Sequence, residues 1–179
     1  MTASGCEGWS IQKTVGHLVA AAEQTRLNSV REIAAAKFNF DAFAEKGAAR
    51  TGAARTEELI RRLRARTTTT NGPPAPPVAM LGEIVVHGDD VRRPLGIANR
   101  SPEAALIAIA DGWKNSNFVI GSKRRIEGLR LRATDASWSH GEGPEVSGPL
   151  QSLVLAMTGR RASHHDLSGD GLSVLAARK

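Results

Sequence analysis

The sequence lacks the features on which several classes of protein depend. It contains one cysteine, Cys6, so no intrachain disulfide can form, which favours a reducing compartment. No apolar run approaches the roughly 20 residues of a membrane helix. The first ten residues carry neither the basic nor the apolar segment of a secretory signal. We therefore expect a soluble, cytoplasmic protein without a membrane partner.

Aromatic residues are also scarce, at 4% of the chain with no tyrosine, which favours helices packed through small side chains over a sheet-rich sandwich. The net charge of +6 is compatible with nucleic acid or a small anionic ligand. However, the densest basic run, at 61–66, reads as one face of a solvated helix. The aromatics that would stack on bases are not interleaved with it. We expect no nucleic-acid partner.

The first two-thirds of the chain has helical patterning, which predicts an all-helical bundle. Apolar residues recur with helical spacing, and three of the four segments have a capping residue or a proline near their start. Glycine- and alanine-rich residues 45–55 and the threonine- and proline-rich stretch 67–77 predict connections. The helices are expected at 10–36, 55–67 (with Thr56 as cap), 78–91 and 102–117 (with Ser101 as cap).

The pattern changes near residue 122, which predicts a second domain over 123–179. Residues 126–135 alternate apolar and polar as a strand does, and 139–149 are turn-like. Residues 149–160 predict a short amphipathic helix, and a final strand follows the turn at Gly169–Gly171. The fold class expected is α+β: a helical bundle over 1–122 and a small α+β domain that packs on it.

Glu83 and His87 lie four residues apart in an apolar run, so a helix places them on one face. An unpaired carboxylate among apolar neighbours is costly, and His17 supplies a second imidazole from the first helix. Two histidines and a glutamate form a known zinc ligand set, and bundles build metal sites between facing helices. The alternatives are that Glu83 and His87 form a surface pair or a hydrogen-bonded pair at the rim of the bundle, and that His17 is a core histidine.

Three stretches of the sequence resemble one family. The run "CEGWSIQKTVGHLVAAA" is similar to the start of the mycothiol-dependent maleylpyruvate isomerase family, whose fold is a DinB-like metal-binding bundle. The run "GEIVVHGDDVRRPLG" resembles that family's second ligand helix. The segment from "GLRLRATD" to "LSVLAAR" resembles its C-terminal domain, including the "GPEV-x-GP" and "LSGDG" elements.

This resemblance implies a function. It places the family's metal triad on His17, Glu83 and His87 and implies a divalent metal, with zinc expected from the ligand type. It also implies mycothiol as thiol co-substrate and an actinobacterial source. Zinc binds thiolate well, so a thiol at its open position would lose its proton near neutral pH. The expected reaction is thiol-assisted isomerisation or thiol transfer, on an electrophilic or carboxylate-bearing substrate.

Supporting roles are assigned to four further residues. Arg92 is predicted to bind substrate carboxylate, and Arg93 and Arg160 to bind the thiol. The structural alternatives are that an arginine after the ligand helix pairs with an aspartate, and that Arg160 complements a helix dipole. Asp90 is a candidate catalytic base, or else the acceptor that fixes the tautomer of a ligand imidazole. Trp9 is expected in the core.

The chain departs from the family at its start, where members carry another helix upstream of the motif that holds Cys6. An incomplete bundle would leave an apolar groove, which favours a homodimer, instability or a nonfunctional remnant. Two other functions stay open. One is a hydrolase that uses a metal-activated water, with Asp90 as its base. The other is a non-catalytic binding or stress-response module that the metal stabilises. A metal with an open coordination position favours catalysis, whereas a metal with a fourth protein ligand favours the non-catalytic module.

Overall fold

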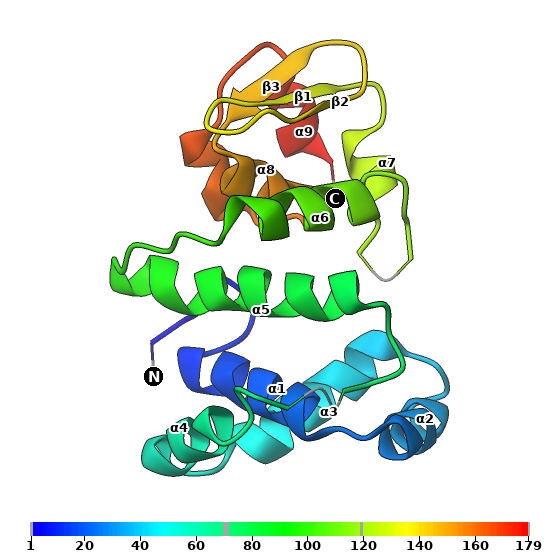
Figure 1. The fold of residues 1–179 in the computed structure, drawn as a ribbon, viewed down its shortest axis with the longest axis vertical. Helices are drawn as coiled ribbons and strands as arrows, with labels where there is room; N and C mark the ends of the chain where they lie inside the picture. The colour runs from blue at the N-terminus through cyan, green and yellow to red at the C-terminus, as the bar shows by residue number, and fades with distance from the viewer. Residues whose placement is uncertain (1, 70–71, 119, 179) are drawn as a thin grey trace. The chain divides into compact units, whose positions relative to one another are not determined.

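The computed structural model describes residues 2–69, 72–118 and 120–178 and divides into two compact units, Met1–Asn99 and Arg100–Lys179. In the first unit α1 packs against α3, α4 and α5, so α1 is the centre of a helical bundle (Figure 1). The elements of this unit are α1 (Ile11–Glu23), α2 (Arg26–Ala35), α3 (Phe40–Gly52), α4 (Thr56–Arg64), α5 (Pro77–Arg92) and the 3₁₀ helix η1 (Arg93–Leu95).

Side-chain caps explain why the first helices begin where they do. The hydroxyl of Ser10 accepts a hydrogen bond from the Lys13 amide at 3.2 Å, and that of Thr25 accepts one from Asn28. The Thr25 cap divides the single helix predicted over 10–36 into α1 and α2, with Gln24 in extended conformation between them. The predicted Ser10 cap is confirmed. The predicted Thr56 cap is wrong, because Thr56 is the first residue of α4.

The prediction of a connection over 45–55 is wrong, because α3 runs through most of it. Its alanines favour helix, and Gly52 lies at a close contact between helices. A Cβ on Gly16 in α1 would lie 2.5 Å from the backbone of Gly52 in α3, so only glycine permits this approach. The side chain of Gln12 donates to the carbonyls of Gly52 and Ala54 and so closes the end of α3.

The loop predicted over 67–77 is confirmed for its described residues up to Pro76; residues 70 and 71 lie outside the described part of the chain. Pro77 then begins α5 at a position where the missing amide proton does no harm. Within the described residues, no helix is both long enough and apolar enough to span a membrane.

The second unit is a small mixed sheet with helices, which confirms the α+β class. The strand order is β2-β1-β3: β1 pairs antiparallel with β2 and parallel with β3, and Leu131 lies opposite His140 and Val146 in these two pairings. The elements are α6 (Glu103–Trp113), α7 (Ser122–Ile126), β1 (Arg130–Ala133), β2 (Ser139–His140), β3 (Glu145–Gly148), α8 (Leu150–Met157), the 3₁₀ helix η2 (Arg161–Asp166) and α9 (Leu172–Ala177).

Helix α8 forms the core of this unit (Figure 1). Every residue of α8 except Gln151 is buried, and α6, α7, β1, β3 and η2 all contact it. The predicted helix is therefore present, but it is apolar on nearly all sides rather than amphipathic. Helix α6 belongs with α8, so the contacts divide the chain between Asn99 and Arg100, whereas the sequence predicts a boundary near 122.

Three further predictions for this unit are wrong. The turn-like stretch 139–149 holds the short strands β2 and β3, which complete the sheet around β1. The predicted final strand is the helix α9, which buries Leu175. The proposed Ser101 cap is also absent, since Pro102 precedes the first residue of α6.

Replacing Gly16 by alanine tests the close packing of α1 and α3. The added Cβ meets the Gly52 backbone at 2.5 Å, so the helices must separate. We expect Gly16→Ala to lower the free energy of unfolding by about 1–3 kcal/mol, measured by urea denaturation with circular dichroism.

Gly47→Ala is the matched control for this substitution. Its Cβ would lie 3.7 Å from that of Ala20 on α1, which is ordinary contact. We expect this variant to be neutral or stabilised by up to about 1 kcal/mol, because alanine favours helix. Equal stability of the two variants would contradict the packing argument.

Candidate metal centre

Three side chains from two helices meet in the first unit. Nε2 of His17, on α1, lies 2.8 Å from Oε2 of Glu83, on α5. Nε2 of His87, one turn further along α5, lies 3.4 Å from the same oxygen. The two imidazole rings approach edge to face, with centroids 4.8 Å apart. The structure therefore brings together the three residues that the sequence predicts as metal ligands.

The local fold explains why these side chains converge. Residues 83 and 87 share one face of α5, and α5 packs on α1. His17 follows Gly16, whose close contact with Gly52 determines where along its length α1 meets α3. The exposed fractions of the side chains are 13% for His17 and 10% for His87, against 40% for Glu83. The cluster is thus walled by protein at the imidazoles and open to solvent at the carboxylate.

The electrostatics of the cluster suit a cation. Burial would raise the pKa of the Glu83 carboxyl, but hydrogen bonds with His17 and His87 outweigh burial and hold this pKa well below its usual value. Glu83 is therefore ionised at neutral pH. A carboxylate that faces two imidazole nitrogens is an anionic site that a divalent ion can share.

The donor set fits a divalent metal. Ligand atoms about 2.0–2.1 Å from a tetrahedral zinc ion lie roughly 3.4 Å from one another. The His87–Glu83 separation is 3.4 Å, and the shorter His17–Glu83 separation is a hydrogen bond. All three ligand atoms lie within 4.8 Å of one another. Small side-chain adjustments are enough to convert this cluster into a His2Glu ligand set.

Asp90 orients His87. Its Oδ2 lies 2.8 Å from Nδ1 of His87, and its side chain is only 1% exposed. When Nδ1 is the protonated nitrogen and donates a hydrogen bond to Asp90, the lone pair of Nε2 points toward Glu83 and His17. Carboxylates on the far side of ligand imidazoles are typical of metal sites. This contact supports the acceptor role for Asp90 over a role as catalytic base.

Trp9 covers the two imidazoles, a contact that the sequence analysis did not anticipate. Its ring stacks on His87, with centroids 6.2 Å apart and an interplanar angle of 10°, and meets His17 edge-on at 5.4 Å. Its Nε1 donates to Glu45 at 2.8 Å, and Lys13 lies over the ring. Trp9 therefore limits the freedom of both histidines.

A second group of ligand-type side chains adjoins the first. Ligand atoms of Cys6, His87 and Asp90 lie within 4.8 Å of one another. Sequence reasoning missed Cys6 as a site residue because no periodicity links it to α5. The path of the N-terminal arm (residues 2–10) brings it there. The only sequence signal was its place in the "C-x-G-W" motif.

The predicted arginines have different environments. Nε of Arg93 donates to Oδ2 of Asp89 at 2.8 Å, which ties down the end of α5 as the structural alternative expected. Arg92 is exposed, and its Nη1 would lie 2.7 Å from a Cβ on Gly88. Arg160 belongs to the second unit, where its Nη1 lies 3.4 Å from the carbonyl of Thr158.

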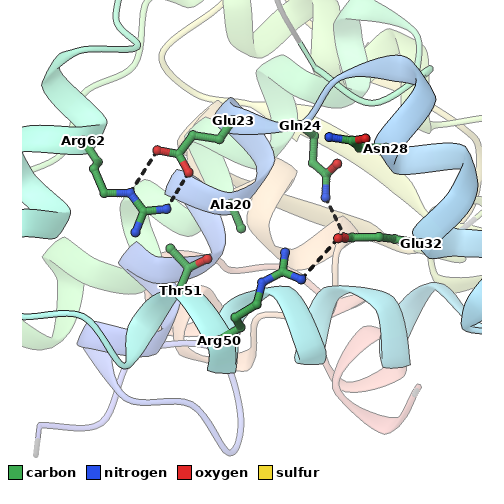
Figure 2. Close-up of a pocket in the computed structure, with 8 residues that line it drawn as sticks. All are labelled: Ala20, Glu23, Gln24, Asn28, Glu32, Arg50, Thr51 and Arg62. Atoms are coloured by element: carbon green, nitrogen blue, oxygen red, sulfur yellow. Dashed lines mark hydrogen bonds and ion pairs between the residues drawn. The ribbon is translucent and has the colours of Figure 1, made fainter.

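A polar pocket of about 180 Å³ lies among α1, α2, α3 and α4 of the first unit (Figure 2). Figure 2 shows that its charged side chains point toward one another. Arg62 forms a bidentate ion pair with Glu23, and the Glu32 carboxylate accepts hydrogen bonds from Arg50 and Gln24. Because these charges neutralise each other, the pocket is a polar junction between helices and lacks the convergent nitrogen ligands of the metal cluster.

No family model matches the chain, and neither a curated protein nor a solved structure matches it. The resemblance to the mycothiol-dependent maleylpyruvate isomerase family therefore remains a prediction that rests on the quoted residues. The feature that the geometry establishes is a candidate metal-binding group of His17, Glu83 and His87.

Proposed function

We propose that the protein is a metal-dependent enzyme that activates a small thiol at His17, Glu83 and His87. The observation that carries this proposal is the convergence of the two imidazoles on the ionised Glu83 carboxylate, with the buried Asp90 behind one of them. Catalytic zinc sites typically have three protein ligands and an open fourth coordination position, whereas structural sites have four protein ligands.

The residues of the chain have distinct roles in this proposal. His17, Glu83 and His87 hold the ion, which supplies a Lewis-acidic centre that favours deprotonation of a thiol. Asp90 fixes the tautomer of His87, and Trp9 restrains both imidazoles. Arg92, exposed at the end of α5, is the better candidate for binding a substrate carboxylate, because Arg93 is held by Asp89.

The proposed thiol is mycothiol, and the proposed reaction is thiol-assisted isomerisation or thiol transfer. Support comes from the family resemblance of the segments that carry Cys6, Glu83 and the C-terminal "LSGDG" run. In isomerisation the sulfur adds to an activated double bond, rotation follows, and the thiol leaves again. In transfer the adduct is the product. Arg160 is the proposed thiol-binding residue of the second unit.

A hydrolase that uses a metal-activated water is the less favoured alternative. It needs a carboxylate base beside the ion, and Asp90 was the candidate. Asp90 is buried and faces Nδ1 of His87, on the side of the ring away from Glu83. The geometry therefore favours thiol chemistry, in which the thiol supplies the nucleophile.

Metal content is the first test of the proposal. We expect purified wild-type protein to hold about one zinc ion per chain by mass spectrometry and Glu83→Gln to lose it, because the anionic ligand is removed. Glu57→Gln, an exposed carboxylate on α4, is the matched control and should keep the metal. A wild type that stays metal-free after incubation with zinc would refute the proposal.

The orienting role of Asp90 is tested by comparing substitutions of Asp90 and of the adjacent Asp89. We expect Asp90→Ala to weaken zinc binding by about 10–100-fold, because His87 loses the acceptor that fixes its tautomer. Asp89→Ala, which removes the carboxylate paired with Arg93 and leaves Asp90 in place, should bind zinc nearly as the wild type does. Competition with a chelator measures both affinities. Equal affinities of the two variants would refute the role of Asp90.

The thiol requirement is tested with maleylpyruvate and mycothiol. We expect isomerisation only when both zinc and thiol are present, and a loss of at least about 100-fold in Glu83→Gln, in step with its metal loss. Turnover that persists without any thiol would point instead to the hydrolase or to another metal-dependent reaction.

A further inference from the structure

The second ligand group lies at the junction of the N-terminal arm and α5. Its members are a thiol, an imidazole and a carboxylate, and their ligand atoms lie within 4.8 Å of one another. The side chains of His87 and Asp90 are 10% and 1% exposed, so two of the three are fixed inside the protein. The soft sulfur donor distinguishes this group from the His17–Glu83–His87 group and favours a thiophilic ion such as Cd²⁺.

The backbone holds Cys6 in this place. The amide of Gly5 donates to the carbonyl of Asp90 at 2.7 Å, so the arm is bonded to the end of α5. A Cβ on Gly5 would lie 2.8 Å from Oδ1 of Asp90, and glycine therefore permits the approach. The amide of Cys6 donates to the hydroxyl of Ser4, which Thr14 of α1 also contacts. The thiol thus sits on a loop that is tied to both ligand helices.

We propose that Cys6, His87 and Asp90 form a second metal position that takes a thiophilic divalent ion. Cys6 contributes a thiolate, whose proton passes to solvent when the ion binds. Asp90 contributes a carboxylate oxygen, and His87 contributes Nδ1, the nitrogen that faces Asp90.

The two metal positions exclude one another, because a neutral imidazole has one lone pair and one N–H. An ion at the first position uses Nε2 of His87 and leaves the Nδ1 proton with Asp90. An ion at the second position uses Nδ1 and leaves the Nε2 proton to donate to Glu83. Occupation of the Cys6 position therefore removes one ligand from the His17–Glu83–His87 centre and turns it off.

The exclusion rests on the proposed function, but the existence of the second position does not. The test is titration with Cd²⁺ in a buffer with a phosphine reductant, so that Cys6 is the only thiol present. We expect the wild type to develop the ultraviolet charge-transfer band of cadmium thiolate. Cys6→Ser should lose this band and bind zinc within about twofold of the wild type.

Two variants separate the positions. Glu83→Gln should keep the cadmium band while it loses zinc, and His87→Ala should lose both. Cadmium binding to the wild type without a thiolate band, or loss of the band in Glu83→Gln, would overturn the second position. Circular dichroism of each variant verifies folding.

Native mass spectrometry tests the exclusion. Cadmium added to zinc-loaded protein should release zinc and leave about one ion per chain. Simultaneous binding of zinc and cadmium would overturn the exclusion. A cadmium band from a wild type that binds no zinc would instead refute the proposed function and leave the second position standing.

Discussion

The approach of α1 to α3 at Gly16 and Gly52 is the contact on which the rest of the first unit depends. Without side chains between them, the two backbones come close enough for α1 to pack at once on α3, α4 and α5. His17 is the next residue along α1, so its place opposite Glu83 follows from that contact. The glycines that would weaken an isolated helix are thus required by the packing.

A chain of contacts then links the N-terminal arm to the candidate metal centre. The arm bonds to the Asp90 backbone through Gly5, the Asp90 side chain faces His87, and Trp9 stacks on the same imidazole. His87 therefore contacts Trp9 of the arm, Asp90 at the end of α5 and Glu83 of the candidate site. Under the two proposals above, the tautomer of this imidazole decides which side of the ring can bind an ion, because only the nitrogen without a proton has a free lone pair.

The parts of the centre that were predictable from the sequence lie on one regular helix or on its neighbour. Glu83 and His87 could be paired because four residues make one turn of α5, and His17 because bundles place facing helices side by side. Cys6 and Trp9 could not, because an irregular arm brings them to the histidines. The α3 prediction failed for a related reason. Glycines that punctuate loops in a sequence here allow tight helix packing, and only the tertiary structure distinguishes the two uses.

The sequence separation of the ligands has a consequence for folding. His17 and Glu83 are 66 residues apart, with α2, α3 and α4 between them. An ion held by both residues closes this segment into a loop as a covalent cross-link would. By the chain-entropy model, a cross-link over a loop of that length stabilises the native state by about 4 kcal/mol through the unfolded ensemble. An ion at the candidate site would therefore reinforce the apolar core of the first unit as well as occupy the ligand cluster.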